Sequence, residues 1–193
     1  MLRSVISRTS INKTDVQEYV AHLQARIDAM ARTQAMLARA PDSTVELEDI
    51  VRDELVAHAA DGDRYCVSGP AIDLGAHAAE VIALAVHELA TNSVKFGALG
   101  ERSGNVRVDW SVVSKNTEQW VRLIWRETGL DLTNLHPLGG YGAELITKLI
   151  PYELRGHGQI DFPRDGVVAT IEFPMGEGSA IVQPDSVPEP GTG

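Results

Sequence analysis

The pattern of apolar and polar positions predicts helices in the first half of the chain. A heptad seam runs through the segment from Thr14 to Ala40, where apolar residues recur at steps of four and three. Its members are Val16, Val20, Leu23, Ile27, Met30, Gln34 and Leu37, and Gln34 is the polar exception. Residues 2–9 resemble the end of an earlier helix, with Ser10–Lys13 as the turn. Because a helix pair of this size buries little apolar surface, we expect it to dimerise into a four-helix bundle.

Two further amphipathic segments follow. Val45–Ala59 predicts a helix whose apolar positions point inward and whose acids point to solvent. The predicted inward residues are Leu47, Ile50, Val51 and Leu55, and the predicted outward residues are Glu46, Glu48, Asp53 and Glu54. Ala76–Phe96 predicts a long helix that ends at Gly97, a residue type suited to the C′ position.

After Gly97 the period changes from that of a helix to that of a strand. Asn105–Val113 and Gln119–Glu127 alternate apolar and polar residues, and Ser114–Glu118 between them has the length of a hairpin loop. The other predicted elements are strands at 64–68, 72–74, 152–156, 159–162 and 167–173, a glycine-rich loop at 128–142 and a short helix at 143–150. This order predicts an α+β sandwich with helices on one face of a mixed sheet.

The element order also suggests domain boundaries. We expect helices of a dimerisation unit in residues 1–60 and an α+β domain in residues 61–175. Residues 176–193 are rich in Gly, Pro, Ser and acids, which favours a disordered tail.

Composition narrows the class of protein. The 193 residues carry a formal net charge of −10, which argues against nucleic acid or an anionic membrane surface as the main partner. Cys66 is the one cysteine, so no internal disulfide forms and a reducing compartment is favoured. The sequence contains no long apolar run and no secretory signal at its first residues, so we expect a cytoplasmic location.

A polar row on the long helix is the main candidate for chemistry. Glu88, Asn92 and Lys95 fall within about 60° of one another on one face, opposite a face of small, mostly apolar residues. An acid, an amide and a cation in a row suit a metal–phosphate group. The alternative is an ordinary solvated face.

Three segments together resemble the sensor histidine kinases. His87–Leu99, read HELATNSVKFGAL, resembles their N-box, and Trp125-Arg126-Glu127 is similar to the Trp-x-Glu box of the HWE branch. Gly139-Gly140-Tyr141-Gly142 looks like their second glycine box, and Gly166–Pro174 looks like the closing strand of the same domain. The resemblance covers roughly residues 1–175. It implies a two-layer ATP-binding domain of the histidine kinase, Hsp90 and gyrase type, preceded by a helical dimerisation hairpin.

The resemblance also implies a role for each box. The N-box implies that Glu88, with His87 beside it, orients or deprotonates the attacking group. It also implies that Asn92 holds Mg²⁺ and that Lys95 neutralises phosphate charge. The carboxylate of Glu127, where the family usually has Asp, would accept a hydrogen bond from the adenine amino group.

The remaining implied contacts surround the nucleotide. Gly129, Gly140 and Gly142 would let the backbone approach ATP, Thr170 would contact the adenine side, and residues 128–140 would form a lid.

Some of these residues also have ordinary explanations. His87 fits a structural or orienting role beside a packed core, and Gly139-Gly140 fits a simple turn. Thr170 fits an ordinary strand position, and Glu127 fits a surface acid at a strand end.

The family's phosphate acceptor is a histidine in a His-Arg-x-(Lys/Arg)-Asn motif, and no such motif occurs in this sequence. Neither His22 nor His58 has the required neighbours. The chain is therefore expected to be either a fragment that begins just past its acceptor or a natural variant that acts on a histidine elsewhere.

Three functions remain open at this point. The first is a kinase core that uses ATP and Mg²⁺, acts as a homodimer, and passes the phosphoryl group from a histidine to an Asp of a response regulator. The second is a non-catalytic phosphotransfer or regulatory module with a nucleotide-like domain. The third is another member of the same superfamily, such as a serine kinase that restrains a sigma factor.

Overall fold

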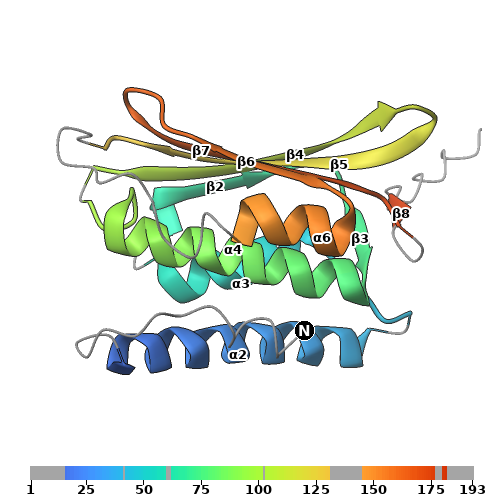
Figure 1. Cartoon of the computed structure of the whole chain (residues 1–193), viewed down its shortest axis with the longest axis horizontal. Coiled ribbons are helices and arrows are strands. Elements are labelled where there is room, and N and C mark those ends of the chain that lie inside the picture. The colour runs from blue at the N-terminus through green and yellow to red at the C-terminus, as the bar shows by residue number, and fades with distance from the viewer. Residues whose placement is uncertain are drawn as a thin grey trace, which may run out of the picture.

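The computed structural model describes residues 16–40, 42–59, 62–101, 103–130, 145–176 and 180–181. They form a sheet, a layer of helices beneath it, and a long helix, α2, beneath that layer (Figure 1). In chain order the elements are α2 (Val16–Arg39), β1 (Thr44–Glu46), α3 (Leu47–His58), η1 (Gly62–Arg64), β2 (Tyr65–Ser68), β3 (Ile72–Gly75), α4 (Ala76–Phe96), β4 (Asn105–Lys115), β5 (Glu118–Thr128), η3 (Leu145–Leu149), α6 (Ile150–Leu154), β6 (His157–Asp161), β7 (Gly166–Pro174) and β8 (Ala180–Ile181). The predicted α+β class is confirmed.

The main sheet has five strands in the order β2-β4-β5-β7-β6. The pair β2–β4 is parallel and the other pairs are antiparallel. A smaller sheet, β1-β3-β8, lies beside it. The sheet is therefore mixed, as the element order predicts.

Strict alternation along the strands separates the two faces of the main sheet. On β5, Val121, Leu123 and Trp125 are fully buried against the helices, and Glu127 continues the same row. Burying a large apolar side chain of this kind contributes about 1.5–3 kcal/mol relative to leaving it exposed. The inward row thus anchors the sheet, and the outward residues face away from the helices.

Helix α4 lies at the centre of the helical layer. It contacts α2, α3, η3 and α6, and its residues 81–90 are all buried. Small residues such as Ala83 and Ala90 let it pack closely. The predicted bounds of this helix, Ala76–Phe96, are confirmed.

Two predicted elements are corrected. The helix expected from Val45 begins at Leu47, because Thr44–Glu46 pair with β3 as β1. The strand expected at 152–156 is wrong, since Ile150–Leu154 form α6. Ile150 and Leu154 are both buried one turn apart, and Pro151 occupies the first turn, where it costs no helical hydrogen bond.

Two turns also differ from expectation. The β4–β5 strands extend to Lys115 and from Glu118, so the loop has two residues, Asn116 and Thr117, with φ of 47° and 75°. Gly97 is extended rather than left-handed. A Cβ there would lie 2.1 Å from Oε2 of Glu127, so close approach and not backbone conformation favours glycine.

The face of α2 that packs on the other helices is not the predicted seam. Arg26, Ala29, Thr33 and Leu37 are buried, whereas Val20 and Ile27 are 44% and 45% exposed. Within the described seam, Leu37 is buried, Leu23 and Met30 are half-buried, and Val20, Ile27 and Gln34 are exposed.

Other predictions fall partly outside the described residues. These are the earlier helix at 2–9, Gly140 and Gly142, most of the lid and most of the tail. Within the predicted tail, Ala180 and Ile181 pair with β3, and the disorder of the tail stays a prediction. The domain boundary at residue 60 stays a prediction, although α3 shares one apolar core with α4 and the sheet.

Among the described helices, none is long and apolar enough to cross a membrane.

Candidate functional site

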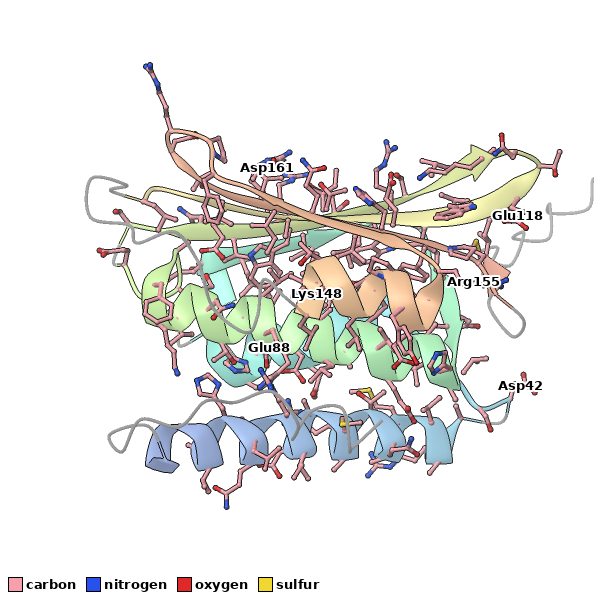
Figure 2. The ribbon with its side chains drawn as sticks, in the orientation of Figure 1. Asp42, Glu88, Glu118, Lys148, Arg155 and Asp161 are labelled. Carbon is pink, nitrogen blue, oxygen red and sulfur yellow. The ribbon has the colours of Figure 1, made fainter. Side chains whose placement is uncertain are left out.

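The polar row of α4 lies on its α2 side and not against the sheet. Figure 2 shows Glu88 on the part of α4 that faces α2. Glu88 is 3% exposed, and its Oε1 accepts a hydrogen bond from Nε of Arg26 over 2.6 Å. This ion pair holds α2 against α4, because a buried carboxylate without a partner costs several kcal/mol, on the order of 3–5.

The next two members of the row become progressively more accessible. Asn92 is half-buried, and no hydrogen bond within the described part of the chain occupies its amide. Lys95 is exposed, and its ammonium donates to Nε2 of His22 on α2. The structure thus brings the three residues together, with Asn92 offering an oxygen suited to a hard cation.

Glu127, on β5, lies against the C-terminal end of α4. Its Oε2 accepts hydrogen bonds from the Ser93 hydroxyl (2.9 Å) and the Ala98 amide (2.7 Å). Its Oε1 accepts one from the Trp125 indole over 2.9 Å. The Trp-x-Glu box therefore has a local physical meaning, since side chains two positions apart on one strand face the same side of the sheet. The box ties β5 to the end of α4.

Burial and hydrogen bonding oppose each other at this carboxyl. Burial raises the pKa of Glu127, and the hydrogen bonds from Ala98, Trp125 and Ser93 offset this only in part, so the pKa stays above its ordinary value. An ionised carboxylate has about four acceptor positions. The three donors leave a position at Oε1 for a further donor.

Gly129 follows β5 directly with φ of 79°, which disfavours residues with a side chain. A Cβ there would also meet the Ser103 carbonyl oxygen at 2.7 Å. Glycine at this position is thus required by the backbone itself, and the predicted approach to a nucleotide stays a prediction.

Thr170 does not join the other candidates. It pairs with Ile124 and Gln159 on the outward face of the sheet, whereas Glu127 faces the helices. The strand period decides this, because Ala169 and Ile171 on either side of Thr170 are fully buried.

His87 is buried behind the row rather than in it. Its Nδ1 lies 2.9 Å from Oε2 of Glu54 on α3, and Oε1 of Glu54 accepts from Arg32 of α2 over 2.5 Å. This arrangement fits a structural or orienting role. Glu54, Arg26 and Arg32 are residues that the sequence-based prediction missed.

The prediction that Glu54 points to solvent is wrong, since its side chain is 2% exposed. The sequence contains a signal for this: Glu54 is seven residues after Leu47, which places both on the same helix face. Burial alone raises the pKa of Glu54, but its contacts with His87 and Arg32 together lower that pKa below the ordinary value. An acid on the apolar face is therefore stabilised by charge partners on two other helices.

A cavity of about 510 Å³ lies at the opposite end of β5, outside this site. It is lined by Glu118, Gln119, Trp120, Arg155, Pro174, Met175, Gly176 and Ile181. In Figure 2 the labelled Glu118 and Arg155 lie far along the sheet from Glu88.

Comparisons with known proteins point to one family. The family model described as HWE histidine kinase matches residues 1–71. Blue-light-activated histidine kinase 1 of Erythrobacter litoralis is 33% identical over 181 residues, which cover 91% of this chain and 49% of that protein. The chain thus spans about half the length of this relative.

Solved structures show the same architecture. The Erythrobacter litoralis EL346 blue-light activated histidine kinase has a TM-score of 0.60 at 20% identity, covering 80% of this chain and 54% of that one. The catalytic domain of histidine kinase ThkA has a TM-score of 0.50 at 15% identity, covering 68% and 95%. The predicted fold, a two-layer α/β sandwich like that of histidine kinase catalytic domains and preceded by a helix, is confirmed.

Proposed function

The chain belongs to the HWE histidine kinases, and from this premise we propose that it binds Mg-ATP along the C-terminal half of α4 and transfers the γ-phosphoryl group to a histidine. The half-buried Asn92 carries the proposal. Its amide oxygen has no protein donor within the described residues and lies one helical turn from both Glu88 and Lys95. An oxygen ligand beside a cation matches what a magnesium–phosphate group requires.

Each residue of the site then has a distinct task. Asn92 would hold Mg²⁺ together with phosphate oxygens and water, and Lys95 would neutralise phosphate charge. Oε1 of Glu127 would accept a hydrogen bond from the adenine amino group, while Oε2 keeps the end of α4 in place. The lid predicted at residues 128–140, together with Gly140 and Gly142, would complete the nucleotide site.

Glu88 is held by Arg26 in this structure. For Glu88 to orient or deprotonate the attacking histidine, α2 has to shift and release it. The phosphoryl group would pass from that histidine to an Asp of a response regulator. No histidine of this sequence has the acceptor motif, so the acceptor would lie outside these 193 residues. The need for ATP and a response regulator favours a cytoplasmic location.

Nucleotide binding is tested by calorimetry with ATP, with and without Mg²⁺. We expect saturable binding that strengthens with Mg²⁺, and at least about tenfold weaker Mg-ATP binding in Asn92→Ala, which corresponds to about 1.4 kcal/mol. Gln159→Ala, an exposed amide on the outward face of the sheet, is the matched control. Equal affinities of Asn92→Ala and the parent chain would remove Asn92 from the site.

Phosphoryl transfer is tested with ATP labelled at the γ position. The chain alone is expected to stay unlabelled, and a second protein that carries the acceptor motif is expected to gain an acid-labile label. An acid-labile label on the chain alone would show that one of its own histidines is an acceptor.

One observation favours the second candidate, a non-catalytic regulatory module. Glu88 is occupied by Arg26, and Glu127 already accepts three hydrogen bonds from the chain. Absence of binding at millimolar ATP with Mg²⁺ would favour this module over the kinase.

A further inference from the structure

A cluster of three metal-ligating side chains lies between α3 and α4. Glu54 and His58 come from α3 and His87 comes from α4, and each offers a ligand atom within 4.8 Å of the other two. The two imidazole rings meet edge to face with centroids 5.2 Å apart. Glu54 and His87 are buried, and the side chain of His58 is 18% exposed.

The hydrogen bonds within this cluster are one donor short. Nδ1 of His58 lies 2.7 Å from the carbonyl oxygen of Glu54, and Nδ1 of His87 lies 2.9 Å from the carboxylate of Glu54. Both oxygens are acceptors, so in neutral rings both Nδ1 atoms carry the hydrogen and both Nε2 atoms are bare.

The two Nε2 atoms face the same hydroxyl. Oγ1 of Thr91 lies 3.3 Å from Nε2 of His58 and 3.5 Å from Nε2 of His87. One hydroxyl donates one hydrogen, so it cannot satisfy both rings. Among the described residues, one of the two Nε2 atoms is therefore left without a hydrogen-bond donor.

A metal ion on the Nδ1 side would remove this shortage, because it places the hydrogen of each neutral ring on Nε2. Both Nε2 atoms then carry hydrogens, and the Thr91 oxygen accepts from both. Oε1 of Glu54 stays bound to Arg32. Each of the three ligands would thus have a supporting partner, as ligands of protein metal sites usually do.

The two distances from the Glu54 carboxylate bracket the spacing that a small tetrahedral ion requires. Oε2 of Glu54 lies 2.9 Å from Nδ1 of His87 and 3.8 Å from Nδ1 of His58. Ligand atoms around tetrahedral zinc, at about 2.0–2.2 Å from the metal, are about 3.4 Å apart. His58 would give up its contact with the Glu54 carbonyl, which the helix itself can satisfy through an i→i+4 bond.

We propose that Glu54, His58 and His87 form a binding site for Zn²⁺ or a similar transition-metal ion, which clamps α3 to α4. Water reaches the fourth position from the accessible side of His58. Two imidazoles and one carboxylate select such ions over Mg²⁺, which prefers oxygen ligands. The site is separate from Asn92 and does not depend on the proposed kinase activity.

The test uses the full chain without a polyhistidine tag, freed of metal by a chelator. Zn²⁺ is titrated by calorimetry, and Co²⁺ is followed by its visible absorption. We expect one equivalent per chain, a tetrahedral Co²⁺ spectrum and a Tm that rises with Zn²⁺. His58→Gln and Glu54→Gln should each bind at least about tenfold more weakly.

Two further variants locate the ion. His157→Gln, which removes an exposed histidine on β6, should bind as the parent chain does. Thr91→Val keeps the shape of the side chain but removes the common acceptor, so it should weaken Zn²⁺ binding while circular dichroism stays unchanged. Absence of saturable Zn²⁺ binding below about 100 μM, or equal binding by the parent, His58→Gln and Glu54→Gln, would overturn the proposal.

Discussion

At the scale of single residues, buried carboxylates determine how the candidate site is held. Glu54, Glu88 and Glu127 are each less than 5% exposed, and each has donors from other elements. Buried charges of this kind stabilise a structure only while their partners remain, and removing one partner is costly. Their substitution therefore has effects that depend on the partner and on pH.

Glu127→Gln is expected to lower the free energy of unfolding by about 1–3 kcal/mol. A glutamine has one acceptor oxygen, so its NH₂ group would face at least one of the donors Ser93, Ala98 or Trp125 without a hydrogen bond. Urea unfolding measures the change. Glu118→Gln, at the exposed hairpin end of the same strand, serves as control. An unchanged unfolding midpoint would mean that the carboxylate does not anchor α4.

The lowered pKa of Glu54 predicts a loss of stability in acid. A carboxyl with a folded-state pKa below its unfolded value of 4.5 stabilises the fold above that pH, and the contribution is lost as pH falls through the folded pKa. The stability difference between the parent chain and Glu54→Gln should therefore be full above the unfolded pKa of 4.5 and shrink as pH falls below 4.5 through the folded pKa. Urea unfolding across this range checks it, and a constant difference would contradict it.

At the scale of elements, α2 docks through charged contacts rather than through its apolar seam. Arg26 binds Glu88 on α4, and Arg32 binds Asp53 and Glu54 on α3. Such contacts require specific geometry and exchange readily with water once separated. The docking of α2 is thus more sensitive to single substitutions than the packing of the sheet.

Arg26→Ala is expected to release α2 from α4, since it leaves Glu88 buried without its partner at a cost of about 3–5 kcal/mol. Hydrogen exchange should become faster in α2, while β5 keeps its protection. Arg39→Ala, an exposed arginine in the last turn of the same helix, is the control. Equal exchange in the parent and Arg26→Ala would show that this ion pair does not hold α2.

Thr117→Gly in the β4–β5 turn is expected to stabilise the chain by about 1 kcal/mol. Thr117 is β-branched and has φ of 75°, where glycine has no steric cost, and Asn-Gly is a favoured pair in two-residue turns. Ser114→Gly, inside β4, should instead destabilise by about 0.5–1 kcal/mol. A lower Tm for Thr117→Gly would contradict the assigned turn geometry.

At the scale of the whole molecule, α2 has two usable faces. One packs on α3 and α4, and the other leaves Val20 and Ile27 exposed at heptad spacing. An exposed apolar stripe on a helix is a common site of association. We therefore place the proposed homodimer contact on the outward face of α2.

Ile27→Glu is expected to shift the chain from dimer to monomer in light scattering, because it puts a charge into the proposed helix–helix contact. Its stability as a monomer should change little, since Ile27 is 45% exposed. Val56→Glu, at an exposed apolar position on α3, should leave the dimer intact. A parent chain that is already monomeric would remove the proposed contact.

Local periodicity was enough to predict much of the molecule. The bounds of α4, the strand pair β4–β5 and the class of the fold all follow from patterns among neighbouring residues. The same periodicity would have placed Glu54 on the inner face of α3, had the acid not been assigned to solvent by its chemistry. The helix at 150–154 was missed because a short segment with Pro151 carries little periodic signal.

The sequence alone determined the polar row Glu88–Asn92–Lys95, the shared strand face of Trp125 and Glu127, and the order of the boxes. These depend on the helical and strand periods, which are set by residues a few positions apart. Only the tertiary structure decided that Arg26 occupies Glu88 from 62 residues away, that Glu127 anchors the end of α4, and that His87 belongs to a cluster with α3. Contacts at such separations are set by how helices and sheet pack together, and no local pattern encodes which charged side chain meets which partner.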